Sequence, residues 1–257
     1  MDTLLPSDTA RRQPGKDMFT LALDLSSGTS IPTHHHREGQ LLYASAGVLA
    51  VTTDHGCWVV PSNHGLWIPP NIPHWTRTIG ASSIRTLYIS PGQATLLHNG
   101  CVLVEVSPLL RELVIAALEI KGDISLTGRN AKLIDLLMEE LVAAPVSSMY
   151  LPSPNGERLK GLCREIFLNG TLNWGLAECA SFLNVNAKTV QRWFTTDLGM
   201  SFGAWRKQAR LLVALEWLAL GRNILEVSLE AGYSSPSAFS SMFRKEFGAP
   251  PSVFQMP

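Results

Sequence analysis

Two stretches near the C-terminal end of the chain follow one scheme at an interval of 49 residues. Each has the pattern of a helix, a tight turn and a second helix, in "GLAECASFLNVNAKTVQRWFTTDLG" and "ILEVSLEAGYSSPSAFSSMFRKEFG". Val190 and Phe194 of the first stretch recur as Phe239 and Phe243 of the second, and both pairs have the four-residue spacing of one buried helix face. The repeat predicts an all-helical domain that contains two helix-turn-helix units.

Local turn chemistry supports this interpretation in both units. Asn184 and Gly232 are residue types that adopt left-handed backbone geometry, as a tight turn requires. Asn186 and Ser235 are suited to cap the following helix, and Pro236 suits the first helical turn. We therefore expect the second helix of each unit to begin directly after its turn.

The faces opposite the buried pairs carry short polar side chains and arginine. Such side chains at the start of an exposed helix are what readout of the DNA major groove requires. The competing interpretation is a packing domain whose exposed serines are only solvated. We expect double-stranded DNA as partner, with contacts from Asn186, Lys188, Gln191, Arg192, Thr195, Ser235, Ser237, Ser240, Ser241 and Arg244.

Between and after these units, "GMSFGAWRKQARLLVALEWLALG" and "GYSSPSAFSSMFRKEFGAPPSVF" resemble the AraC/XylS family of transcription regulators over about a hundred C-terminal residues. The resemblance implies that both second helices enter major grooves on one face of promoter DNA. The chain departs from the family pattern at a few positions. Asn184 stands where glycine is usual, Lys188 where arginine is usual, and Thr195 and Thr196 where basic residues are common.

The rest of the chain has a different periodicity, and the whole predicts an α+β protein. Residues 1–17 are polar and predict a flexible tail, whereas short apolar and β-branched runs in 18–95 predict a barrel or sandwich. Residues 104–144 predict two amphipathic connector helices, and the proline-containing stretch 145–156 predicts a linker. The helix-turn-helix domain then covers 157–257.

Apolar residues of the connector helices are candidates for a homodimer seam, with packing inside the domain as the alternative. The two candidate sets are Leu109, Leu113, Ala116 and Ala117, and Leu133, Leu137 and Leu141.

A cluster of histidines lies in the predicted barrel. In "HHHREGQ", strand alternation would place His34 and His36 on one face and His35 on the other, and "IPPNIPH" ends at His74. Three imidazoles can bind zinc, nickel, copper or iron. A divalent transition metal is therefore one candidate ligand of His34, His36 and His74.

These two motifs resemble those of the cupins, in whose enzymes a His-x-His pair, an acid and a distant histidine bind a divalent metal. Here Gln40 replaces the acid, and Asn71 stands where glycine is usual. The resemblance implies a cupin-like sensor barrel with His34, His36, Gln40 and His74 as the effector-binding set. The alternatives are an organic effector held by hydrogen bonds, or histidines that only satisfy polar groups of the barrel. Nearby aromatic residues (Tyr43, Trp58, Trp67 and Trp75) are candidates for a pocket lining or for the core.

Composition narrows the classes of protein. The chain has 257 residues, 46% of them hydrophobic, and a formal net charge of zero. Residues 155–257 carry 11 Lys and Arg against 8 Asp and Glu, a modest positive excess that suits a polyanionic partner. The longest apolar runs are too short to cross a membrane, and the four cysteines have no paired spacing. We expect a cytoplasmic protein with reduced thiols and no membrane partner.

Together these features predict a sequence-specific transcription regulator, an effector-responsive activator rather than an enzyme, with a small-molecule or metal effector. The alternative is a cupin-type metalloenzyme, such as a dioxygenase, with an accessory helical region. A constitutive DNA-binding protein with a purely structural barrel is a third possibility.

Overall fold

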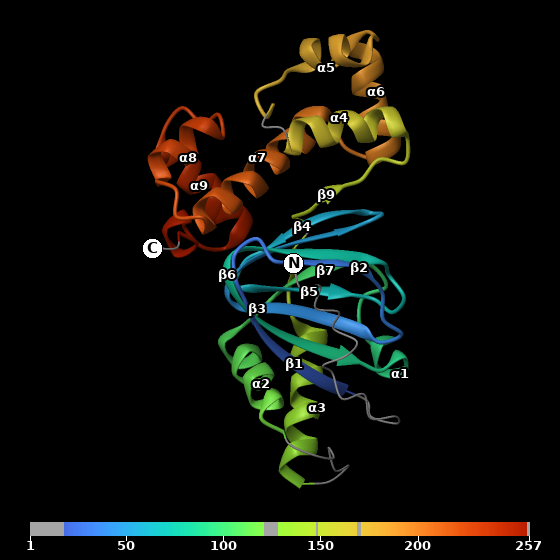
Figure 1. Ribbon diagram of the computed structural model, residues 1–257, viewed down its shortest axis with the longest axis vertical. Helices are drawn as coiled ribbons and strands as arrows, with labels where there is room; N and C mark the ends of the chain where they lie inside the picture. Colours follow the sequence, from blue (N-terminus) through green and yellow to red (C-terminus); the bar gives the residue numbers. More distant parts are fainter. Residues whose placement is uncertain (1–17, 121–127, 148, 169–170, 256–257) are drawn as a thin grey trace. The chain divides into compact units, whose positions relative to one another are not determined.

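The computed structural model divides the protein into two compact units (Figure 1). The first consists of residues 18–53 and 60–147, and the second of residues 54–59 and 149–255. The predicted tail, residues 1–17, lies outside the described residues. The structure describes residues 18–120, 128–147, 149–168 and 171–255.

The first unit is built on an antiparallel sheet. Its strands follow the order β1-β6-β3-β5-β7-β8, and β2 pairs with β6. In β6, buried side chains alternate with more accessible ones along much of the strand, whereas β5 is buried throughout and β3 is buried at most positions. Their bounds are β1 (Met18–Leu25), β2 (Ser30–His34), β3 (Gly39–Thr53), β5 (His64–Ile68), β6 (His74–Ile89), β7 (Val102–Glu105) and β8 (Val146–Ser147).

The two long strands of this sheet, β3 and β6, pair along their whole length and are irregular in the middle. The register shifts around Ala46, and Gly47 has a φ of +82°. A Cβ atom on Gly47 would lie 2.5 Å from the carbonyl oxygen of Ala81, so the two strands approach too closely there for a side chain. One half of β6 pairs with β2 and the other half with β1. The long strands thereby bring β1 and β2 into one sheet.

The helices of the first unit are α1 (Pro91–Ala94), α2 (Pro108–Leu118) and α3 (Gly128–Ala143). Ser107 caps α2, because its Oγ accepts a hydrogen bond of 3.0 Å from the amide of Leu110. The core of the unit combines apolar residues of the sheet with those of α2 and α3, and includes Leu41, Tyr43, Trp67, Leu87, Leu110, Val114, Leu133, Leu137 and Leu141.

This core corrects the dimer seam that the sequence suggested. Leu113 and Ala117 of α2, and all three leucines proposed on α3, are buried inside their own unit. They are therefore committed to intradomain packing. Among the residues of that seam, only Leu109 has an extensively exposed apolar side chain, with 47% of its surface accessible.

Short strands occupy segments where the sequence indicated a connector or a linker. β7 overlaps the start of the predicted connector at residue 104, and it pairs with β5 and β8. The predicted linker contains β8 and also β9 (Leu151–Pro152), which pairs with β4 (Gly56–Val60). Runs of two to four residues carry too little periodicity to be recognised, and their pairing depends on partners that are distant in the sequence.

The second unit is helical apart from the short β4 and β9 pairing. Helix α7 forms its centre, because apolar residues on several sides of this helix are buried and it contacts α6, α8 and the C-terminal 3₁₀ turn. No described helix has the length and apolar character needed to span a bilayer. The helices are α4 (Glu157–Leu168), α5 (Leu176–Leu183), α6 (Ala187–Leu198), α7 (Phe202–Ala219), α8 (Ile224–Glu230) and α9 (Pro236–Phe247), followed by the 3₁₀ turn η1 (Pro251–Val253).

Candidate functional sites

Helices α5 and α6 form the first predicted helix-turn-helix unit. Asn184 ends α5 with a φ of +53°, the left-handed geometry that the sequence predicted. Asn186 then caps α6, and its Oδ1 accepts a hydrogen bond of 2.8 Å from the amide of Thr189. Val190 and Phe194 are fully buried on the inner face. The turn and the cap therefore determine which face of α6 remains outside.

Helices α8 and α9 form the second unit in the same way. Gly232 has a φ of +80° in the turn, and the Oγ of Ser235 accepts a hydrogen bond of 3.2 Å from the amide of Ala238. Phe239 and Phe243 are fully buried with their ring centroids 5.3 Å apart. The predicted equivalence of the two units holds for turn, cap and buried pair.

The predicted DNA-contacting residues lie on the outer sides of α6 and α9. In the described part of the chain, the side chains of Lys188, Arg192 and Arg244 form no ion pair. Six of the ten have exposed side chains beyond the caps: Lys188, Arg192, Thr195, Ser237, Ser241 and Arg244. Gln191, Ser235 and Ser240 are partly buried, and Asn186 is exposed.

Some of these side chains already have structural partners. Asn186 and Ser235 hold the helix starts, as described above. The hydroxyl of Thr195 donates a hydrogen bond of 3.1 Å to the carbonyl of Gln191 one turn earlier. Such hydroxyls can still accept hydrogen bonds from outside. Lys245, which the sequence analysis did not include, is an exposed base in the last turn of α9, and its position beside Arg244 could have revealed it.

Basic residues of α7 connect the parts of this unit. Arg206 donates a hydrogen bond of 2.6 Å to the carbonyl of Trp174, and the Nε of Arg210 donates one of 3.2 Å to the carbonyl of Leu172. Lys207 forms an ion pair of 2.8 Å with Glu246 of α9. These contacts anchor α7 to the segment before α5 and to α9.

In the first unit, strand register brings the predicted histidines together. His34 lies opposite His74 in the pairing of β2 with β6, and their ring centroids are 4.4 Å apart. The ring of His36 is 4.8 Å from that of His34, although β2 ends at His34 and His36 follows it in a loop. One ring nitrogen from each of the three residues lies within 4.8 Å of the others. His35 points elsewhere and is exposed.

The loop of "IPPNIPH" helps to hold this arrangement. Asn71 has a φ of +62°, the left-handed geometry that suits a position where the cupin pattern has glycine. Its amide donates a hydrogen bond of 2.7 Å to the carbonyl of His36. The backbone of His36 is thereby tied to the segment that leads into His74.

Hydrogen bonds define which nitrogen two of the histidines can offer. The Nδ1 of His34 is 2.7 Å from the carbonyl oxygen of Pro32, and the Nδ1 of His74 is 2.9 Å from that of Ile72. A carbonyl oxygen only accepts, so each Nδ1 carries the proton. In the neutral imidazole, Nε2 then keeps its lone pair, which is the arrangement typical of metal-binding histidines. Burial lowers the pKa of His74 to about 4, and the nearby His34 and His35 contribute to the shift.

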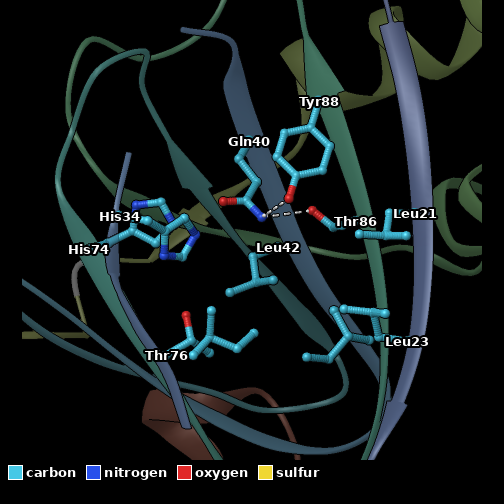
Figure 2. A pocket seen from close by; sticks show the side chains of 11 residues that line it. Leu21, Leu23, His34, Gln40, Leu42, His74, Thr76, Thr86 and Tyr88 are labelled. Carbon is cyan, nitrogen blue, oxygen red and sulfur yellow. Dashed lines mark hydrogen bonds between the residues drawn. The ribbon is translucent and has the colours of Figure 1, made fainter. Parts of the chain in front are cut away.

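Gln40 is buried beside the histidines, at the position of the acid in the cupin pattern. Its Nε2 donates hydrogen bonds to Thr86 Oγ1 at 3.0 Å and to the hydroxyl of Tyr88 at 3.2 Å. The single proton of Thr86 is donated to the carbonyl of Leu41, so Oγ1 must accept from Gln40. This fixes the orientation of the carboxamide. Figure 2 shows its oxygen on the side of His34 and His74, where it has no hydrogen-bond partner among the described residues.

His34, Gln40 and His74 line one small pocket, whose cavity of about 10 Å³ has room for about one water molecule. The sequence analysis missed Thr86 and Tyr88 of this lining, although their alternation with Ile84 along β6 is the pattern that could have found them. The lining consists of Leu21, Leu23, Ile31, His34, Gln40, Leu42, His74, Thr76, Ile84, Thr86 and Tyr88 (Figure 2).

The four candidate aromatic residues lie outside this lining. Tyr43, Trp58 and Trp67 are at most 2% exposed, so they are core residues and do not line the pocket. Trp67 donates a hydrogen bond of 2.7 Å to the carbonyl of His98, and Trp58 stacks on Tyr150. Trp75 is 36% exposed.

Two helix-turn-helix units around one central helix, in a chain that also has a separate sheet domain with a small pocket, are typical of a DNA-binding regulator with a ligand-binding domain. Comparisons with known proteins agree. Residues 179–256 match the model of a helix-turn-helix domain, and residues 24–142 match that of the AraC-like ligand binding domain.

The chain is also 30% identical over 221 residues to the HTH-type transcriptional regulator NimR of Escherichia coli, an alignment that covers 86% of this chain and 80% of that protein. It is 35% identical to the virulence regulon transcriptional activator VirF of Yersinia enterocolitica over 37% of this chain and 35% of that protein. The structure of ToxT from Vibrio cholerae aligns with 93% of this chain and 98% of its own, with 11% identity and a TM-score of 0.38.

The chain therefore belongs to the AraC family, as a DNA-binding transcription regulator with a ligand-binding domain.

Proposed function

We propose that α6 and α9 are the two recognition helices and that they enter successive major grooves on one face of promoter DNA. The observation that carries this proposal is the shared construction of the two units around α7. Each presents an outer face whose basic residues have no ion-pair partner in the described residues, and a positive side chain without a partner suits contact with DNA. The residues proposed to contact DNA are the ten that the sequence predicted on these helices and at their caps.

We propose that an effector binds in the pocket lined by His34, Gln40 and His74, with His36 beside it. It is enclosed by four strands and combines polar groups at one side with aliphatic ones at the other, which is the composition of a small-ligand site. An effector bound there would favour the arrangement that binds DNA, provided that it binds that arrangement more tightly. We propose activation of transcription as the outcome and a homodimer as the acting form.

A catalytic role is the alternative for the same pocket. The relatives are transcription regulators by name, and the pocket lining contains no carboxylate for general acid or base work. We therefore propose a sensory rather than an enzymatic role. Such a regulator would act where its DNA is, in the cytoplasm.

The test is a footprint of the purified protein on its own promoter region, with and without cell extract as a source of effector. Two protected segments about one helical turn, roughly 10 bp, apart on one DNA face are expected. A single protected groove would contradict the assignment of two recognition helices. A footprint that cell extract does not change, or that it changes equally in protein with replaced pocket histidines, would contradict the sensory role.

A further inference from the structure

The two proposed recognition helices carry an acid at equivalent positions in their last turns. Asp197 of α6 and Glu246 of α9 are separated by 49 residues, the interval of the repeat. The phosphates of DNA repel a carboxylate, so neither acid suits a direct contact with the backbone of the duplex. Their partners inside the domain therefore indicate what these acids do.

Asp197 is bound by the segment that leads into α4. Its carboxylate accepts hydrogen bonds from three N–H groups: the backbone amide of Asn155 at 3.1 Å, the side-chain amide of Asn155 at 3.0 Å and the backbone amide of Gly156 at 3.3 Å. These three residues, Asn155, Gly156 and Asp197, form a clasp between the end of α6 and the start of α4.

The clasp replaces a cap that α4 lacks. The carbonyl of Gly156 accepts a helical hydrogen bond of 2.9 Å from the amide of Lys160, which places Gly156 at the cap position. Glycine has no side chain that could accept hydrogen bonds from the unpaired amides of a helix start. Asp197 supplies the acceptor from another helix, and its negative charge is favourable at that end of α4.

The linker before the clasp is itself held in place. Strand β9 pairs with β4, and the amide of Ser153 donates a hydrogen bond of 2.9 Å to the carbonyl of His55. A Cβ atom on Gly56 of β4 would lie 2.5 Å from the carbonyl oxygen of Leu151, so the two strands are in close contact. The clasp therefore attaches α6 to a segment that has its own hydrogen bonds.

Glu246 has a different kind of partner. It forms the 2.8 Å ion pair with Lys207 of α7, and both side chains are partly exposed to solvent. An ion pair of this kind contributes little and constrains direction weakly, whereas several hydrogen bonds to backbone amides fix both distance and direction. The last turn of α6 is thus held by the linker, and the last turn of α9 by the central helix.

We propose that Asp197 is a positioning residue for DNA recognition, which sets the direction of α6 in its major groove through the clasp with the linker. The inference rests on the proposed function, because it requires α6 to be a recognition helix. Asp197 would act through Arg192 of the same helix. Paired hydrogen bonds to a base tolerate only a small displacement, so a slight rotation of α6 would remove them and leave the attraction to phosphates in place.

The experiment compares base preference in full-length variants by selection of bound sequences from a random DNA pool. Arg192→Ala and Arg244→Ala first define the segments read by α6 and α9. Asp197→Ala should relax the preference in the α6 segment only, and it should weaken binding to the selected site about tenfold, as loss of a base contact does. Affinity for unrelated DNA should not change. Asp197→Asn keeps one accepting oxygen and should have a smaller effect.

Glu157→Ala is the matched control. It removes an exposed acid from the first turn of α4, beside the clasp and outside it, and it should leave both segments unchanged. Circular dichroism checks that each variant is folded. Unchanged preference after Asp197→Ala, or equal relaxation of both segments, overturns the proposal. If neither arginine variant alters any base preference, the proposed function fails and the inference fails with it.

Two glycine variants test the part played by the linker. Gly56→Ala should displace β9, because the added methyl group meets the carbonyl of Leu151, and it should relax the α6 segment in the same way as Asp197→Ala. In Gly156→Ala the added methyl group would lie 3.8 Å from the Asp197 carboxylate, an ordinary contact, so this variant should read DNA like the wild type. A folded Gly56→Ala protein with unchanged preference in the α6 segment would overturn the role given to the linker.

Discussion

At the scale of single residues, the two proposed recognition helices, α6 and α9, have the same turn, cap and buried pair but carry different outer side chains. With the 49-residue interval, Lys188, Arg192 and Thr195 of α6 correspond to Ser237, Ser241 and Arg244 of α9. Each helix therefore has its arginine at a different position. Two faces with different side chains should recognise different base sequences, so the two halves of a binding site need not resemble each other.

Replacing Arg192 or Arg244 with alanine should test this difference. Loss of an arginine that makes paired hydrogen bonds to guanine should weaken DNA binding by about 1–3 kcal/mol and should relax the preference at one base position. The two variants should affect different positions of the site. Selection of bound sequences from a random DNA pool measures the base preference of each variant at every position of the site.

Lys245→Ala is the control for Arg244→Ala, because it removes a neighbouring exposed charge of α9. This variant should weaken binding to all DNA sequences to a similar, small extent, and it should reduce the salt dependence of binding. Unchanged affinity and base preference in both arginine variants would show that the reading faces have been assigned wrongly.

At the scale of the elements, the turn before α9 depends on a tertiary contact as well as on its own geometry. Gly232 and Gly248 both have positive φ, at +80° and +76°. A Cβ on Gly232 would lie 2.9 Å from the guanidinium carbon of Arg210, whereas nothing lies within 4 Å of one on Gly248. The guanidinium of Arg210 is itself engaged with the segment before α5. Gly232 thus permits a contact by which α7 joins the two helix-turn-helix units.

These two glycines form a matched pair for a stability measurement. Gly248→Ala should lower the free energy of unfolding by about 1–2 kcal/mol, the cost of left-handed geometry for a residue with a Cβ. Gly232→Ala should lower it further, because Arg210 must also move and give up its hydrogen bonds. Urea denaturation followed by circular dichroism measures both. An equal loss in the two variants would show that the contact with Arg210 contributes nothing.

At the scale of the whole molecule, the buried core of the first unit limits how two copies can associate. The leucines of α3 that the sequence suggested for a seam fill the core of their own unit. Apolar side chains of the same helices that remain accessible include Leu109 and Leu136, which are 47% and 40% exposed. A dimer through these helices would have to use such outer side chains.

If the proposed homodimer forms through these outer side chains, light scattering of the full chain at micromolar concentration should show a dimer. Leu136→Glu should shift it to a monomer, since a charge would be buried in the interface. Val253→Glu, which changes an exposed apolar residue of the other unit, should leave the dimer intact. A wild-type monomer would remove the dimer proposal, and a dimeric Leu136→Glu would place the interface elsewhere.

The sequence by itself determined the parts that depend on neighbours along the chain. Left-handed Asn184 and Gly232, the caps at Asn186 and Ser235, and the buried phenylalanines follow from preferences that act within one or two turns. The AraC family and the α+β architecture could be recognised from these patterns. The left-handed geometry of Asn71 followed instead from the cupin resemblance, because Asn71 stands where that pattern has glycine.

Only the tertiary structure decided the groups that distant segments bring together. The pairing of β2 with β6 places His34 against His74, and the hydrogen bond from Thr86 to the carbonyl of Leu41 orients Gln40. Likewise, only the tertiary structure pairs Arg206 with the carbonyl of Trp174 and Lys207 with Glu246. Strand register and side-chain hydrogen bonds depend on the packing of the whole unit. A strand or a polar side chain could pair with several partners, and only the packing of the core leaves one of those pairings possible.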